Sequence, residues 1–166
     1  MKNIYILFGI AFFSIAESQN LKPEREAFVL KVQRNAKQFY AQQVKQTPYF
    51  VTDKTLQIYP LEKVNIEIEI KNDTIFSIVS VAENLHPEKT IEIEFCQTVE
   101  KHQASPAFLY VRNPFPKKLS YNAIAYLVDD SQWKQINKTA KANWTSLEAW
   151  KEVIGSLVLK DWKFEK

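Results

Sequence analysis

The chain contains very little cysteine and glycine. Its 166 residues include one cysteine, Cys96, and two glycines, Gly9 and Gly155. A single cysteine excludes an internal disulfide and CxxC chemistry. Phosphate-binding loops need several glycines where the backbone approaches the ligand, which excludes a Walker loop and a dinucleotide fingerprint. Nucleotide-dependent enzymes are therefore not expected, and we expect no cofactor.

Long apolar runs are also scarce. The main uncharged run, IYILFGIAFFSIA, spans residues 4–16 and follows Lys2. It is shorter than the roughly 20 residues of a membrane-spanning helix but has the length of a secretory signal. Small residues permit cleavage after Ala16 or Ser18. We predict a signal peptide over residues 1–18, no transmembrane segment after cleavage, and a periplasmic or extracellular mature protein.

Charge of one sign does not dominate. The 22 basic and 19 acidic residues give a net charge of +3, and 46% of the residues are hydrophobic. This composition is typical of a folded globular domain. Nucleic-acid binding would require a denser basic stripe, so we expect no nucleic-acid partner.

The segment after the signal has a pattern that fits a helix. Pro23 suits a first helical turn, and Thr47-Pro48 suits an end. Apolar side chains recur between them at spacings close to one helical turn: Phe28, Val32, Ala36, Phe39, Tyr40 and Val44. Such a stripe usually faces a core. We predict an N-terminal α-helical segment over residues 19–48.

From residue 49 the apolar period changes to two. Residues 64–70 alternate isoleucine or valine with asparagine or glutamate, as in a strand with one buried face. Similar patterns predict strands over residues 74–81, 91–95, 108–112, 119–128, 133–136 and 156–164. Short strands at this spacing favour an antiparallel β-sandwich over residues 49–166. The fold class expected is mainly β, an immunoglobulin-like sandwich with an N-terminal α-helix. The alternative is an α+β fold, a helix on a curved antiparallel sheet, cystatin-like or nuclear-transport-factor-like.

Two of these strands carry acidic faces. Glu67 and Glu69 lie on one strand, and Glu92 and Glu94 lie on another. Antiparallel sheets commonly have one solvated face, which predicts an outer position for these carboxylates. If the two strands are neighbours, the repulsion between them must be relieved by lysines or by a cation.

The tryptophans are the most unevenly distributed residues. All four, Trp133, Trp144, Trp150 and Trp162, lie in the last 34 residues. Trp133 and Trp162 fall in predicted strands and suit a core. Trp144 and Trp150 fall in residues 136–153, which we interpret as a loop. Loop tryptophans often mark binding surfaces.

Basic side chains accompany these two tryptophans. Lys141 and Lys151 lie in the same segment. Together with Trp144 and Trp150 they are the predicted binding residues, and the partner expected is an envelope protein or a glycan. The alternative interpretation is that Trp144 and Trp150 only pack over the end of the sandwich.

Catalysis would have to use Cys96 with His102, and His86 is the only other histidine. These residues match no strong zinc pattern, so no metal site is expected. A Cys96–His102 dyad requires only that the two side chains meet in space. A small hydrolase using this dyad therefore stays open as an alternative, as does a protease inhibitor presenting residues 112–118.

Two segments, about a quarter of the chain, support a resemblance. FLYVRNPFPKKLSYNAIAYL (residues 108–127) looks like an Asn-Pro hinge between two strands of an immunoglobulin-like domain. SLEAWKEVIGSLVLKDWKF (residues 146–164) is similar to the ends of small exported bacterial proteins without an assigned activity. The resemblance implies a β-sandwich of the cell envelope and supplies no catalytic residues. The expected function is that of an exported, non-enzymatic binding module of the bacterial envelope.

Overall fold

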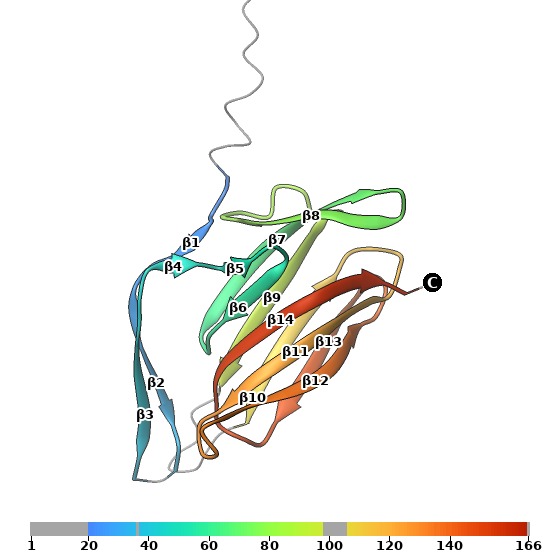
Figure 1. Cartoon of the computed structure of the whole chain (residues 1–166). Coiled ribbons are helices and arrows are strands. Elements are labelled where there is room, and N and C mark those ends of the chain that lie inside the picture. The colour runs from blue at the N-terminus through green and yellow to red at the C-terminus, as the bar shows by residue number, and fades with distance from the viewer. Residues whose placement is uncertain (1–19, 36, 98–105, 166) are drawn as a thin grey trace, which may run out of the picture.

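The computed structural model of the chain describes residues 20–35, 37–97 and 106–165. The predicted signal peptide, residues 1–18, lies outside the described residues. The strands, shown in Figure 1, are β1 (Glu24–Arg25), β2 (Phe28–Gln33), β3 (Phe39–Val44), β4 (Thr47–Pro48), β5 (Phe50–Thr52), β6 (Thr55–Ile58), β7 (Glu62–Lys71), β8 (Thr74–Val81), β9 (Thr90–Gln97), β10 (Ala107–Asn113), β11 (Leu119–Leu127), β12 (Gln132–Ala140), β13 (Trp144–Trp150) and β14 (Ile154–Phe164). None of the described residues forms a helix long and apolar enough to cross a membrane.

Two five-stranded antiparallel sheets form the body of the molecule (Figure 1). One has the strand order β13-β10-β9-β7-β8 and the other the order β12-β11-β14-β6-β5. Their inward residues join in one buried cluster that includes Ile66, Ile93 and Leu109 from the first sheet and Ala123 and Leu157 from the second. Side chains alternate across a strand, so period-two sequences bury one face and expose the other. The prediction of a mainly β, antiparallel fold is confirmed.

The predicted helix over residues 19–48 is wrong for the described residues, which form the hairpin β2–β3 there. Leu30 and Val32 are buried while Val29 and Lys31 are exposed, which is the alternation of a strand. Asn35 closes the turn, because its side-chain oxygen accepts the backbone N–H of Gln38 at 3.0 Å. The helical spacing was ambiguous because β-branched and aromatic residues also suit strands.

The hairpin packs on the body through a second buried cluster. Leu30, Val32 and Val44 of the hairpin meet Tyr59, Val128 and Val153 of the body in that cluster. Near the turn of the hairpin, Arg34 forms an exposed ion pair with Asp129. An isolated two-stranded hairpin is marginally stable in water, so burial against the body stabilises this one.

At the base of the hairpin lies a buried arginine. Arg25 in β1 is 1% exposed and donates to Glu62 Oε1 at 2.9 Å and to Thr47 Oγ1 at 2.8 Å. Its guanidinium carbon lies 4.8 Å from the ring centroid of Tyr49 and 5.1 Å from that of Tyr59. A buried charge needs a counter-charge and full hydrogen bonding. Arg25 has the Glu62 counter-charge and a hydrogen bond from each of its three guanidinium nitrogens, and it joins the N-terminal strands to the body.

The two acidic strands, β7 and β9, are neighbours. Their register sets Glu92 opposite Asn65 and Glu94 opposite Lys63, so no two of these carboxylates face each other directly. Arg112 and Lys63 lie 3.0 and 3.8 Å from Glu92. Lys89 Nζ lies 2.8 Å from Glu67. Basic side chains therefore relieve the repulsion, which was one of the expected solutions.

The segment interpreted as a loop, residues 136–153, is mostly strand. It contains the end of β12, a connection over residues 141–143, and all of β13. β12 is at the edge of one sheet and β13 is at the edge of the other, so the chain crosses between sheets at this connection. Residues 144–150 show no polar–apolar alternation, because Ser146 and Glu148 lie opposite buried residues of β10 while Leu147 is on the outward face.

Candidate functional site

Trp144 is an exposed aromatic side chain at the rim of a cleft. It opens β13 and is 63% exposed. The cleft has a volume of about 600 Å³, and its remaining lining residues are Pro87, Glu88, Arg112, Asn113, Pro114, Asn143 and Thr145. They come from the β8–β9 loop, the end of β10 and the β12–β13 connection. Three segments distant in the sequence therefore meet at Trp144.

Asn113 holds the wall of this cleft in place. It is buried, and its Nδ2 donates to the carbonyls of Lys117 and Lys141 at 2.8 and 3.1 Å. Its Oδ1 accepts the backbone N–H of Phe115 at 3.1 Å, an Asx-turn. The backbone N–H of Asn143 also donates to the Phe115 carbonyl at 2.9 Å. The Asn-Pro turn and the β12–β13 connection are thereby fixed to each other.

Arg112 supplies a positive charge to the cleft. It lies on the outward face of β10, and its Nη1 donates to Glu92 Oε1 at 3.0 Å. Asn84 Nδ2 donates to the same carboxylate oxygen at 2.9 Å. Glu92 therefore orients the guanidinium while leaving other N–H groups of Arg112 for a ligand. Glu88, which also lines the cleft, supplies a hydrogen-bond acceptor.

The four residues predicted for binding do not form one surface. Trp144 and Lys141 lie at one end of β13, and Trp150 and Lys151 lie at the other. The two tryptophans are the first and last of the seven residues of β13, so about 20 Å of strand separates them. Trp150 is only 8% exposed, and Lys138 Nζ lies 5.3 Å from its ring centroid. The structure therefore leaves Trp144 accessible and places Trp150 in the core.

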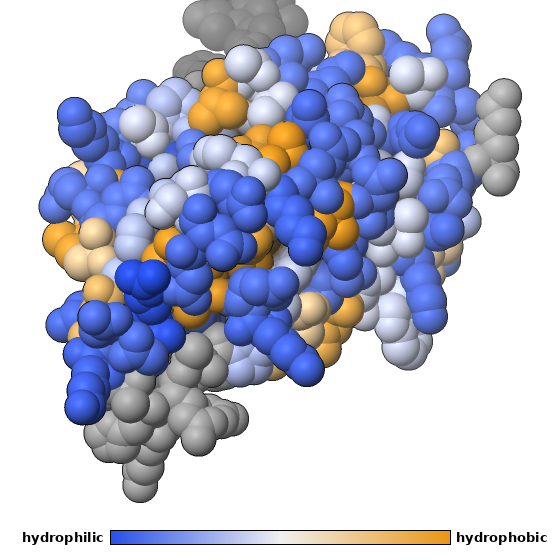
Figure 2. Space-filling model, turned by 60° about the horizontal axis from the view of Figure 1, so that its bottom comes forward, coloured by the Kyte–Doolittle hydropathy of each residue, from blue (hydrophilic) through white to orange (hydrophobic). Residues whose placement is uncertain are grey.

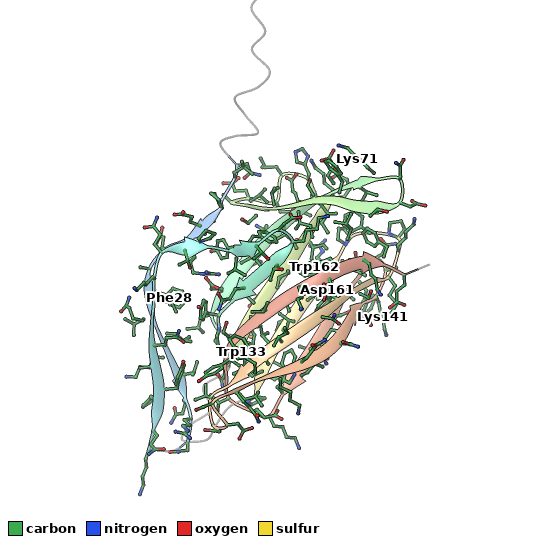
Figure 3. The ribbon with its side chains drawn as sticks, viewed as in Figure 1. Phe28, Lys71, Trp133, Lys141, Asp161 and Trp162 are labelled. Atoms are coloured by element: carbon green, nitrogen blue, oxygen red, sulfur yellow. The ribbon has the colours of Figure 1, made fainter. Side chains whose placement is uncertain are left out.

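The other two tryptophans also differ from each other. Trp162 is buried and its ring stacks on Tyr121 at 5.0 Å. Asp161 has a φ of 58° at an irregularity in the β11–β14 pairing, and this turns Trp162 inward (Figure 3). Trp133 is exposed beside Tyr126, which does not fit the expected core position. Figure 3 shows Trp133 and Lys141 at opposite ends of β12.

Cys96 lies on the outward face of its sheet, opposite Phe108. Burial raises the pKa of its thiol, and the charge of Glu94 adds to this increase. A higher pKa leaves less thiolate at neutral pH and so less nucleophile. His102, its proposed partner, lies outside the described residues. Among the described residues, no three His, Cys, Asp or Glu side chains group as metal ligands would.

Sequence reasoning did not assign Arg112, Asn143 or Glu88 to the same site as Trp144. The sequence predicted residues 112–118 to be part of an Asn-Pro hinge or, in the alternative, an inhibitor loop; Phe115 of this segment is buried against Phe164. The Asn113-Pro114 dipeptide was the sequence signal for this site, because an asparagine before a proline commonly starts a turn. A comparison with protein-family models, curated proteins and solved structures found no match to the chain.

Proposed function

We propose that the chain is an exported, non-enzymatic binding module of the bacterial cell envelope that binds a glycan in the Trp144 cleft. One observation carries the proposal: an exposed tryptophan lies in a cleft whose other lining side chains include a cation, a carboxylate and an amide. A pyranose ring has an apolar face that can stack on an indole and hydroxyls that both donate and accept.

Each polar group of the cleft has a complementary role. The Arg112 guanidinium donates hydrogen bonds, the Glu88 carboxylate accepts them, and the Asn143 amide does both. The Asn113 hydrogen bonds fix the cleft wall before a ligand arrives. A wall that is already ordered lowers the entropy lost on binding.

Export is supported by the N-terminal sequence. Lys2, the uncharged run over residues 4–16 and the small residues at its end have the order of a cleaved signal. The proposal places the sandwich among immunoglobulin-like domains, and two packed antiparallel sheets support this assignment.

The binding test uses the mature chain and a panel of neutral and uronic-acid oligosaccharides, followed by tryptophan fluorescence and calorimetry. We expect at least one glycan to bind, and Trp144→Ala to weaken its affinity on the order of 30-fold, the effect of losing about 2 kcal/mol. Arg112→Gln should weaken acidic glycans more than neutral ones.

Trp133→Ala is the matched control. Trp133 is also an exposed tryptophan, but it lies at the end of β12 that is away from Lys141 and the β12–β13 connection. It should leave the affinity unchanged. Absence of binding across the panel, or equal losses for the two tryptophan variants, would contradict the proposal.

A further inference from the structure

The two main sheets have four edges, and three of them are blocked. β5 is only three residues long and pairs irregularly with β6. Pro48 lies two residues before the strand begins. Along β8, residues 20–22 cover one end, where Lys22 N donates to the Ser80 carbonyl at 2.9 Å, and Lys54 Nζ donates to the Ile75 carbonyl at 3.0 Å. β12 carries an exposed lysine, Lys134. Short strands, prolines, covering segments and lysines prevent edge-to-edge pairing.

The fourth edge, β13, is protected less than the other three: within residues 144–150 only Glu148 is charged, and it faces inward opposite the buried Leu109. It is seven residues long and contains no proline, and its pairing with β10 is regular throughout. Its only charged side chain, Glu148, is neutralised within the molecule by Lys138 Nζ at 2.5 Å. On its outward face Leu147 is 52% exposed beside Tyr110. In Figure 1, β12 and β13 lie at the side of the molecule away from β8.

We infer that β13 pairs antiparallel with β13 of a second copy of the chain and joins two five-stranded sheets into one. The inference goes beyond the proposed function and does not depend on it. The occupant is a second copy because the strand complements itself in one register. A two-fold axis at Leu147 pairs all seven residues and sets Leu147 opposite Leu147 of the other copy.

Charge favours this register. It sets Glu148 opposite Ser146, whose hydroxyl can donate to the carboxylate, and it sets Thr145 opposite Ala149. Lys151, just beyond the strand, then lies opposite Asn143. No two like charges meet directly, whereas an axis at Glu148 would bring two carboxylates together. Tyr110 and Leu147 of each copy extend one apolar strip across the axis.

A cysteine cross-link tests the register directly. Residues facing each other in an antiparallel pair have Cα atoms about 4.5–5.5 Å apart, within the range that a disulfide spans. In a Cys96→Ser background, Leu147→Cys should therefore form a disulfide-linked dimer on mild oxidation. Thr145→Cys is the matched control, because its two copies would lie four residues apart along the strands, about 13 Å, and should not cross-link.

The oligomeric state provides the second test. The mature chain should have twice its monomer mass in light scattering after size exclusion, and Leu147→Lys should reduce it to a monomer. Val79→Lys, at an exposed position on β8 of the same sheet, should leave the dimer intact. A wild-type chain that stays monomeric at high concentration, or cross-linking of Thr145→Cys as efficient as that of Leu147→Cys, would overturn the inference. The cross-linking result remains decisive if Leu147→Lys misfolds.

Discussion

Because the chain has few glycines, other residues adopt the left-handed backbone conformation that glycine usually takes. Seven described non-glycine residues have a positive φ: Lys54, Leu61, Asn72, Asp73, Ser131, Asn143 and Asp161. Asparagine and aspartate tolerate this region because their side chains bond locally to the backbone. Asn72 and Asp73, with φ of 50° and 59°, form the two-residue turn of the β7–β8 hairpin.

Leu61 is the most strained of these positions. It has a φ of 78° and follows Pro60 in a turn that the Glu62 N–H closes on the Tyr59 carbonyl at 3.1 Å. This geometry is that of a type II turn, whose third position favours glycine. Because Leu61 is 67% exposed, it gains little from burial.

We predict that Leu61→Gly raises the free energy of unfolding by about 1 kcal/mol, since it removes the steric conflict of Cβ in the left-handed region. Urea unfolding would measure the change. Leu61→Ala is the matched control: it shortens the side chain but keeps Cβ, so it should give no gain. An equal gain from alanine would show that strain is not the cause.

At the scale of elements, alternation was a reliable signal where one face of a strand is buried. The predicted strands over residues 64–70, 74–81 and 91–95 correspond to β7, β8 and β9. Alternation was insufficient for β2 and β3, whose apolar residues fit a helical stripe equally well. Their state depended on a partner surface, Tyr59, Val128 and Val153, that local spacing does not encode.

The attachment of β1 gives a prediction at this scale. Arg25→Met should lower the free energy of unfolding by roughly 3–5 kcal/mol, because it leaves the Glu62 carboxylate buried without its counter-charge. The double variant Arg25→Met/Glu62→Gln should recover part of this loss. Chemical denaturation of the three proteins would measure it.

The control for that prediction is Arg34→Met. Arg34 also joins the N-terminal strands to the body through an ion pair, but both partners are exposed to solvent. Exposed pairs contribute about 0–1 kcal/mol. A loss from Arg25→Met as small as that from Arg34→Met would show that burial of the pair is not what matters.

At the scale of the whole molecule, the one described glycine lies where the hairpin meets the body. A Cβ on Gly155 would approach Tyr40, Tyr126 and Val128, each at 3.2 Å. Tyr40 belongs to the hairpin, and the other two belong to the body. Figure 2 shows that, on one face of the molecule, apolar patches are separated by hydrophilic side chains.

We predict that Gly155→Ala lowers the free energy of unfolding by roughly 1 kcal/mol, because three side chains must move to admit one methyl group. The loss should shrink in a Tyr40→Ala background, where one of the three contacts is gone. A double-mutant cycle on urea unfolding measures this coupling. Equal losses in the two backgrounds would rule out crowding at the hairpin interface.

The candidate site was predictable only in part. Tryptophan enrichment near the C-terminus identified Trp144, because aromatic side chains outside regular core patterns are visible in a sequence. The same argument included Trp150, which is buried, since composition does not distinguish the two ends of one strand. Arg112 and Glu88 joined the site through strand pairing across long sequence separations.

Composition and local period by themselves predicted a mainly β, antiparallel fold and the approximate positions of most strands after residue 63. These properties depend on residue type or on neighbours within a few positions. Only the tertiary structure decided that residues 28–44 form a hairpin, that Arg25 is buried against Glu62, and that Trp144 and Arg112 share a cleft. Each of those outcomes depends on which distant segments become neighbours, because burial and pairing energies arise only once the two sheets have packed.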